Sequence, residues 1–228
     1  MKEKIVYPPI LGNVDGSFQS DLMFMTNYKT KNSGFHIIFN FIEITSRKAY
    51  SYKMKTKKAE EIIENFKRFL QDAQTVKNIT IDNGSEFISK QFKDLAKEKE
   101  ITLTFVDTTD KNRVGMIERF NRTLRDKIRK YCKAYKTLRW VDGFNDLVFN
   151  YNNSIHSRTH YKPNEVTSEI AERIRMMSIQ RRDAAFEALK KFKVGDVVRI
   201  LKEKGIFAKV HLNIQKACTL LKGLIRWL

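Results

Sequence analysis

The sequence predicts an α/β fold in which a mixed five-stranded sheet is flanked by helices. Three strand-like segments precede the first amphipathic helix, and after that helix strands and helices alternate along the chain. Such alternation is typical of α/β proteins. The chain has 228 residues, which is enough for one well-packed core and an appendage.

The first predicted strand, residues 18–26, carries apolar side chains on both of its alternating faces. This pattern is typical of a central strand that is covered on both sides. Asp21 lies inside the strand, and a buried carboxylate is costly unless it is paired or bound to a metal ion. We therefore expect Asp21 to be a functional acid. Asp15, directly before Gly16, is expected to be a turn residue instead.

Short β-branched runs predict further strands, and apolar residues at helical spacing predict helices. The first three strands are expected to form an antiparallel meander. Thr56 is expected to be the N-cap of the first helix, and the aromatic residues of the helix at 137–153 are expected to be core. The predicted elements are strands at 18–26, 35–44, 48–54, 79–82 and 101–105 and helices at 59–70, 89–99, 115–133, 137–153 and 168–191.

A second acid, Asp82, ends the predicted strand at 79–82 and is followed by Asn83-Gly84, a turn signal. A carboxylate at a strand end lies at the lip of a sheet, where it can reach solvent and a metal ion. Asp107 and Asp110, in a polar segment further on, are expected to be surface-loop residues, because Asp is common in loops.

A third acid, Glu118, lies on the predicted helix at 115–133. One side of this helix is apolar, and a second stripe about 120° away carries charge. Such a stripe can be a solvated surface with ion pairs between successive turns. Here a single acid is followed by guanidinium groups, which suits a metal-binding acid beside a phosphate backbone. The stripe consists of Glu118, Arg122, Arg125 and Arg129.

Asp82 stands in the phrase IDNGSEF (81–87) and Glu118 in the phrase IERFNRTL (117–124), with 35 residues between the two acids. These phrases and this spacing resemble the catalytic core of retroviral-type integrases and their transposon relatives. That family uses an Asp, Asp, Glu triad. Its first acid stands in a W/F-Q-x-D phrase, matched here by Phe18-Gln19-Ser20-Asp21. Over residues 18–207 the pattern is most similar to integrases of Maverick/Polinton-like elements and LTR retrotransposons.

The resemblance implies a ribonuclease H-like fold in which Asp21, Asp82 and Glu118 are both the catalytic residues and the metal ligands. It implies two Mg²⁺ ions, for which Mn²⁺ can substitute, and no covalent protein nucleophile. The implied reactions are 3′-end processing and strand transfer of a mobile element or viral DNA into target DNA. Asn121, Arg122 and Arg125 match family positions that contact the DNA end. Further DNA contacts are expected from Arg119, Arg129, Lys111 and Arg113.

The predicted domain organisation is an extended lead-in at 1–16, an integrase catalytic core at 17–167 and a connecting helix at 168–191. Residues 192–207 resemble the start of the small Src-homology-3-like barrel that ends many integrases. The tail beyond Lys209 has helical spacing of apolar residues instead, so we expect 192–228 to form a truncated, partial barrel. The zinc-binding His and Cys set that precedes many integrase cores is not present in the sequence, so that domain is expected to be absent or removed.

The charge of the chain favours a polyanionic partner. Lys and Arg number 44 against 26 acids, for a net charge of +18. Residues 111–139 contain 11 Lys and Arg against two acids, a net charge of +9. We therefore expect double-stranded DNA, both element ends and target, as the partner, and no membrane, because no apolar run approaches the ~20 residues of a span. The two cysteines give no disulfide framework. The resemblance implies a homo-multimer, and a eukaryotic host would place it in the nucleus.

Two other functions remain open from the sequence. A ribonuclease H-like nuclease would share the fold and metals but would cut without joining. A decayed or domesticated remnant would bind DNA without catalysis. The segment at 151–166 resembles a family phrase and is expected to close the core, with His156 as a structural or DNA-facing residue rather than a catalytic base.

Overall fold

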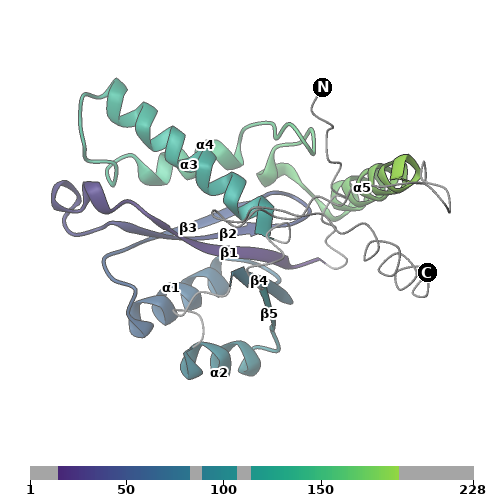
Figure 1. Cartoon of the computed structure of the whole chain (residues 1–228), viewed down its shortest axis with the longest axis horizontal. Helices are drawn as coiled ribbons and strands as arrows, with labels where there is room; N and C mark the ends of the chain where they lie inside the picture. The colour runs from purple at the N-terminus through teal and green to yellow at the C-terminus, as the bar shows by residue number, and fades with distance from the viewer. Residues whose placement is uncertain (1–14, 83–88, 107–113, 190–228) are drawn as a thin grey trace, which may run out of the picture. The chain divides into compact units, whose positions relative to one another are not determined.

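A computed structural model of the chain describes residues 15–82, 89–106 and 114–189 (Figure 1). The chain divides into two compact units, residues 1–186 and 187–228. The predicted partial barrel at 192–228, the lead-in up to residue 14, and the residues Lys111, Arg113, Asp107 and Asp110 lie outside the described residues. Within the described part, no helix combines the length and apolar character that crossing a membrane requires.

The core of the first unit is a five-stranded mixed sheet with the order β3-β2-β1-β4-β5. The first three strands pair antiparallel, and β1, β4 and β5 pair parallel. The central place of β1 confirms the prediction from its two apolar faces. The strands are β1 (Ser17–Phe24), β2 (Ile37–Glu43), β3 (Ala49–Met54), β4 (Asn78–Asp82) and β5 (Thr102–Val106).

Helices cover both faces of the sheet (Figure 1). On one face, α1 (Ala59–Asp72) and α2 (Lys90–Glu98) enclose an aromatic core in which the rings of Phe41 and Phe69 stack 3.8 Å apart. On the other face, α3 (Gly115–Ala134) and α4 (Phe144–Asn152) bury the apolar stripe predicted for 115–133. Each large apolar side chain buried in this way contributes about 1.5–3 kcal/mol. This packing places the first turn of α3 on the face of β1 that carries Asp21.

The start of α1 differs from the prediction. Thr56 is not the N-cap, because the helix begins at Ala59 and Lys58 is the capping position, without a side-chain cap. The hydroxyl of Thr56 instead donates to the carboxylate of Glu61 at 2.6 Å. Glu61 also accepts the backbone N–H groups of Lys55 and Thr56. A side chain in the first turn of the helix therefore holds the segment that precedes the helix.

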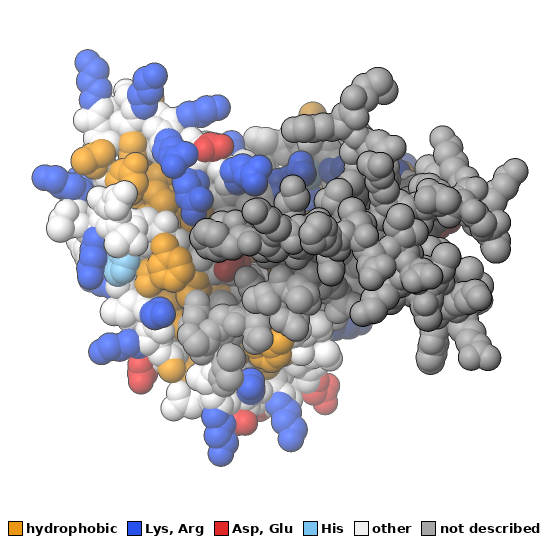
Figure 2. Space-filling view, in the orientation of Figure 1, with side chains coloured by type: hydrophobic (Ala, Val, Ile, Leu, Met, Phe, Trp, Pro, Cys, Tyr) orange, Lys and Arg blue, Asp and Glu red, His pale blue; other side chains and the backbone are white. Residues whose placement is uncertain are grey.

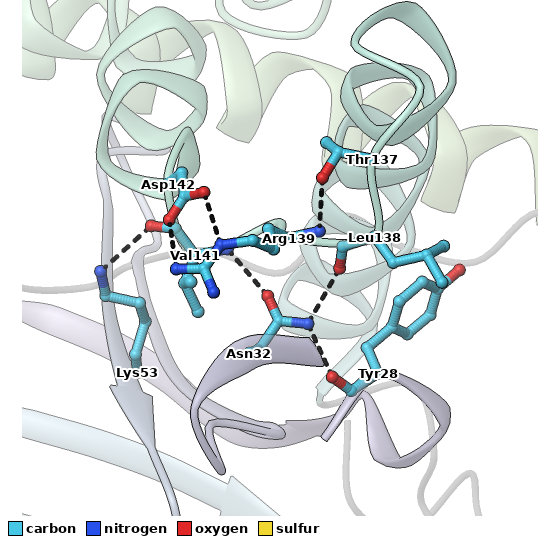
Figure 3. Close-up of polar contacts among 8 residues, drawn as sticks. All are labelled: Tyr28, Asn32, Lys53, Thr137, Leu138, Arg139, Val141 and Asp142. Carbon is cyan, nitrogen blue, oxygen red and sulfur yellow. Dashed lines mark hydrogen bonds and ion pairs between the residues drawn. The ribbon is translucent and has the colours of Figure 1, made fainter. Parts of the chain in front are cut away.

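The helix predicted at 137–153 is also wrong in its first half, since α4 begins at Phe144. The preceding segment is held as a turn by Asn32 (Figure 3). The amide of Asn32 donates to the carbonyl of Leu138 at 2.9 Å, and its oxygen accepts the N–H of Val141 at 3.2 Å. Arg139 and Asp142 pair across the same turn at 2.9 Å. These long-range bonds outweigh the local helical pattern.

The predicted connecting helix is present as α5 (Ser168–Leu189), and its early turns bury Ala171 and Ile174. Arg175 forms ion pairs with Glu172 and with Asp15, which lies in the turn before β1 as predicted. Three single-turn 3₁₀ helices complete the described elements, at Thr26–Tyr28, Thr30–Asn32 and Pro163–Glu165.

Candidate functional site

Asp21 lies in the central strand β1 and is partly buried. Its Oδ1 accepts the backbone N–H of Leu22 at 2.8 Å, and its Oδ2 accepts the side-chain amide of Asn121 at 2.7 Å. The carboxylate is therefore held in one orientation, on the face of the sheet that packs against α3.

The parallel register of β1 and β4 places Asp21 opposite Asp82 just beyond the end of the ladder that joins the two strands. Ser20 pairs with Ile81 in parallel register, and Asp21 and Asp82 are the next residues of their strands. Neighbouring strands lie about 4.7–4.9 Å apart. The backbones of the first two predicted acids are thus adjacent at the carboxyl ends of parallel strands. The side chain of Asp82 lies outside the described part of the structure.

A chain of buried side-chain amides fixes the orientation of Asn121. Asn121 is 7 % exposed, and its oxygen accepts the amide of Asn40 at 2.7 Å. Asn40 in turn accepts the hydroxyl of Ser51 at 2.6 Å. Because the Asn121 oxygen is occupied, its NH₂ group must point to Asp21. This placement favours a positioning role for Asn121 over the predicted contact with DNA.

Gln19 connects β1 to the start of α3. Its side-chain oxygen accepts the N–H groups of Met116 and Ile117 at 3.1 and 3.0 Å, and the residue is fully buried. The first N–H groups of a helix have no partner within the helix, so this oxygen caps α3 from the sheet. Sequence reasoning missed this role. The signal was available, because Gln19 lies two residues from Asp21 and therefore on the same face of the strand.

Glu118 lies in the first turn of α3 and is exposed. It precedes Asn121 by three residues, so both side chains lie on the same side of the helix, one turn apart. Since Asn121 contacts Asp21, the helical turn that carries Glu118 is next to the one that contacts the acid on β1. Among the described residues no group of three His, Cys, Asp or Glu side chains could hold a metal ion, and the side chain of Asp82 is not among those described.

The predicted basic stripe continues along α3 from Glu118. Arg122 and Arg129 are exposed, and Arg125 is partly buried. Arg125 and Arg129 line a groove of about 220 Å³ together with residues 24–28 at the end of β1. Figure 2 shows Lys and Arg side chains gathered over the α3 region. The stripe therefore runs from the candidate acids to an open groove beside β1.

His156 follows α4 and is partly buried, with its ring edge-on to the ring of Tyr151 at 6.5 Å. Its Nδ1 accepts the backbone N–H of Arg158 at 3.2 Å. Burial, together with the charges of Arg47 and Arg119, lowers the pKa of His156 to about 4. The imidazole is therefore neutral near pH 7 and a poor general base, as the structural or DNA-facing role predicts.

The segment at 151–166 closes the core, as predicted, through Asn152. The Asn152 side chain accepts the N–H of Ala49 at 2.9 Å and donates to the carbonyl of the same residue at 2.8 Å. Both contacts are buried, so the end of α4 is fixed to the start of β3. His156 follows four residues after this clamp.

Residues 14–111 match the family described as "Integrase core domain". The matched range contains Asp21 and Asp82 and ends before Glu118. A transposon-derived protein of Caenorhabditis elegans is 29% identical over 187 residues, which are 81% of this chain and 62% of that protein. The chain thus spans somewhat less than two thirds of this relative.

Solved structures show the same fold at low sequence identity. A chain of the simian T-cell lymphotropic virus intasome aligns with a TM-score of 0.62 and 15% identity, over 72% of this chain and 59% of that chain. The HTLV-2 integrase catalytic core domain in complex with magnesium aligns with a TM-score of 0.56 and 16% identity, over 68% and 98%. Residues 14–111 of this chain thus match the integrase core domain family, and its five-stranded sheet with flanking helices has the ribonuclease H-like fold of retroviral integrase catalytic cores.

Proposed function

We propose that this chain is an integrase core that joins DNA ends to target DNA by phosphoryl transfer. One observation carries the proposal. The β1–β4 register and the Asn121 amide bring together Asp21, the backbone of Asp82 and the helical turn of Glu118. We infer from this that the three acids, which come from distant parts of the sequence, share one site beside a basic helix.

The chemistry of these side chains fits divalent metal ions. Carboxylate oxygens are the ligands that Mg²⁺ prefers, and Mn²⁺ accepts the same ligands. Asp21, Asp82 and Glu118 would hold two such ions. When bound, two ions activate the attacking hydroxyl and stabilise the departing 3′-oxygen of an in-line displacement. The HTLV-2 integrase core of the same fold was solved in complex with magnesium.

The chain's own residues position these acids and the DNA. Asn121 holds the Asp21 carboxylate, and Gln19 fixes the start of α3, so β1 and the first turn of α3, which carry two of the acids, are fixed to each other. Preorganised acids and bound phosphates lower the barrier without a covalent protein nucleophile. Arg122 and Arg125 are exposed enough to bind backbone phosphates, which orients the duplex without reading its sequence.

The expected partner is double-stranded DNA, both the element end and the target. The net charge of +18 and the basic stripe on α3 support this proposal. We also propose assembly as a homo-multimer, since an intasome and a trimeric integrase core are among the structures with this fold. Nuclear localisation remains a prediction for a eukaryotic host.

A joining assay tests the proposed function. The protein is incubated with a labelled DNA duplex ending in a 3′-hydroxyl and a supercoiled plasmid, in Mg²⁺ or Mn²⁺. An integrase covalently links label to plasmid in a metal-dependent manner, and Asp82→Asn abolishes the product while DNA binding persists. Nicked but unlabelled plasmid indicates a nuclease. Binding without any reaction in either metal indicates a remnant and contradicts the proposal.

A further inference from the structure

Beside the first turn of α3, three arginines and one histidine from separate parts of the chain are near enough for their charges to interact, and Arg47 contacts Met116 in that turn. Arg47 comes from the β2–β3 turn, Arg119 from α3, and His156 and Arg158 from the segment after α4. Burial, with the charges of Arg158 and Arg119 acting in the same direction, lowers the pKa of the Arg47 guanidinium to about 10. The cluster is not part of the stripe that contains Glu118 and Arg122.

Arg47 is only 9 % exposed, although it lies in a turn, and its φ of 67° is in the left-handed region. Among the described residues, the acceptor for its side chain is the thioether of Met116 in the first turn of α3. A guanidinium has five N–H donors, and a thioether is a weak acceptor. A buried cation with so little compensation is costly.

Glu43 and Tyr151 act on Arg47 in the direction opposite to burial, because each of them raises the pKa of the guanidinium. The Glu43 carboxylate already accepts the backbone N–H of Ser46. Among the described residues Glu43 is the carboxylate that acts on Arg47, and the charges of Arg119 and Arg158 act in the opposite direction, so positive charge predominates around the largely buried Arg47 guanidinium. An anion would compensate this charge.

His156 adds a neutral donor to the cluster. Its Nδ1 accepts the N–H of Arg158, so in the neutral imidazole the proton is on Nε2. The ring is fixed by Tyr151, which itself packs edge-on against Phe120 of α3 at 4.8 Å. The Asn152 clamp fixes the same segment to β3. The donors are therefore held by the fold before any ligand binds.

We propose that Arg47, Arg119 and the Nε2–H of His156 bind one backbone phosphate of DNA beside the candidate acids. This proposal rests on the proposed function, because it takes DNA as the ligand. A phosphodiester supplies several strong acceptors and one negative charge, and charge-assisted bonds from guanidinium groups to phosphate are strong. Arg119 directly follows Glu118 in α3, so the proposed phosphate is near the candidate acids.

The test is a double-mutant cycle on DNA affinity, measured by fluorescence anisotropy with a blunt 25-base-pair duplex at fixed salt. Arg119→Gln and Arg47→Gln should each weaken binding by about tenfold. Because both side chains bind the same phosphate, the double variant should lose clearly less than the product of the two single losses. Lys67→Gln, exposed on α1 across the sheet, is the control and should bind like wild type.

If Arg47→Gln does not fold, a second pair of variants, His156→Asn and Arg119→Gln, is used in the cycle. His156→Asn keeps an acceptor for the Arg158 N–H but removes the Nε2 donor, and it replaces Arg47→Gln in the cycle with Arg119→Gln. Wild-type affinity in folded Arg119→Gln, or single losses that multiply in either pair, would overturn the phosphate site. A wild-type protein that does not bind DNA at all would instead count against the proposed function.

Discussion

The side-chain amide of Asn121 lies 2.7 Å from the carboxylate of Asp21, although 99 residues separate them in the sequence. The contact joins the central strand to α3, the helix that carries Glu118. Asn40 holds the other end of the same amide. This buried amide, together with Gln19, therefore fixes the two elements that carry these candidate acids relative to each other.

Replacing Asn121 should cost both stability and site geometry. Asn121→Ala removes the partner of the buried Asn40 amide and of Asp21, and we expect a loss of about 1–3 kcal/mol in the free energy of unfolding. Urea denaturation of the purified chain measures this loss. Arg122→Ala, on the exposed side of the same helix, is the matched control. Equal stability of the Asn121 and Arg122 variants would refute the role of the amide.

Gln19→Leu should loosen the start of α3. The N–H groups of Met116 and Ile117 would lose their buried acceptor, at a cost of about 1–3 kcal/mol. Amide hydrogen exchange followed by NMR should show lower protection at these two positions than in wild type. Gln91→Leu, exposed on α2, should leave them unchanged. Unaltered protection in Gln19→Leu would show that the cap contributes nothing.

Much of the fold could be predicted from the sequence because its strands and helices have strong apolar periodicity. Two apolar faces on 18–26 predicted a central strand, and the stripe on 115–133 predicted the buried side of α3. Both predictions are confirmed. Asp82 was predicted as a site residue from its place at a strand end and Glu118 from its place on a helix. The family phrases around them and the 35 residues between them supported both predictions.

The features that could not be predicted from the sequence depend on hydrogen bonds between residues far apart in the chain. Asn32 holds residues 138 and 141 from over 100 positions away and prevents the helix that local spacing favours. Gln19 and Asn152 are polar residues whose backbone partners belong to other elements. Polar side chains show no periodicity, so their partners emerge only once the chain is folded.

Arg122→Glu should weaken DNA binding and reduce its dependence on salt. Arg122 is exposed in the basic stripe, one turn beyond Glu118, so the predicted contact is with a backbone phosphate. Each phosphate contact adds about −0.9 to the slope of log affinity against log salt, so the slope should become shallower by at least about one. Anisotropy titrations from 50 to 300 mM KCl measure it, with Lys67→Glu as the control. An unchanged slope would place the DNA elsewhere.

Stability should fall in mild acid because of His156. Its pKa is about 4 in the folded chain, against an unfolded value near 6.5, so the unfolded state takes up the proton first. The contribution of neutral His156 to the free energy of unfolding is complete above pH 6.5 and is lost as the pH falls toward 4. Allowing for partial exposure, it amounts to about 1 kcal/mol. Urea denaturation at pH 7 and pH 4.5 measures how much unfolding free energy each protein loses between the two pH values. The loss should be smaller in His156→Asn than in wild type, and equal losses would contradict this prediction.

Binding of Mn²⁺ tests the convergence of the three acids most directly and needs no catalytic turnover. Electron paramagnetic resonance of free Mn²⁺ measures its uptake by the protein in complex with duplex DNA. We predict that Asp21→Asn, Asp82→Asn and Glu118→Gln each weaken binding by at least about tenfold, as expected for loss of a charged ligand, whereas Asp146→Asn on α4 has no effect. Wild-type Mn²⁺ affinity in both Asp82→Asn and Glu118→Gln would contradict the shared metal site.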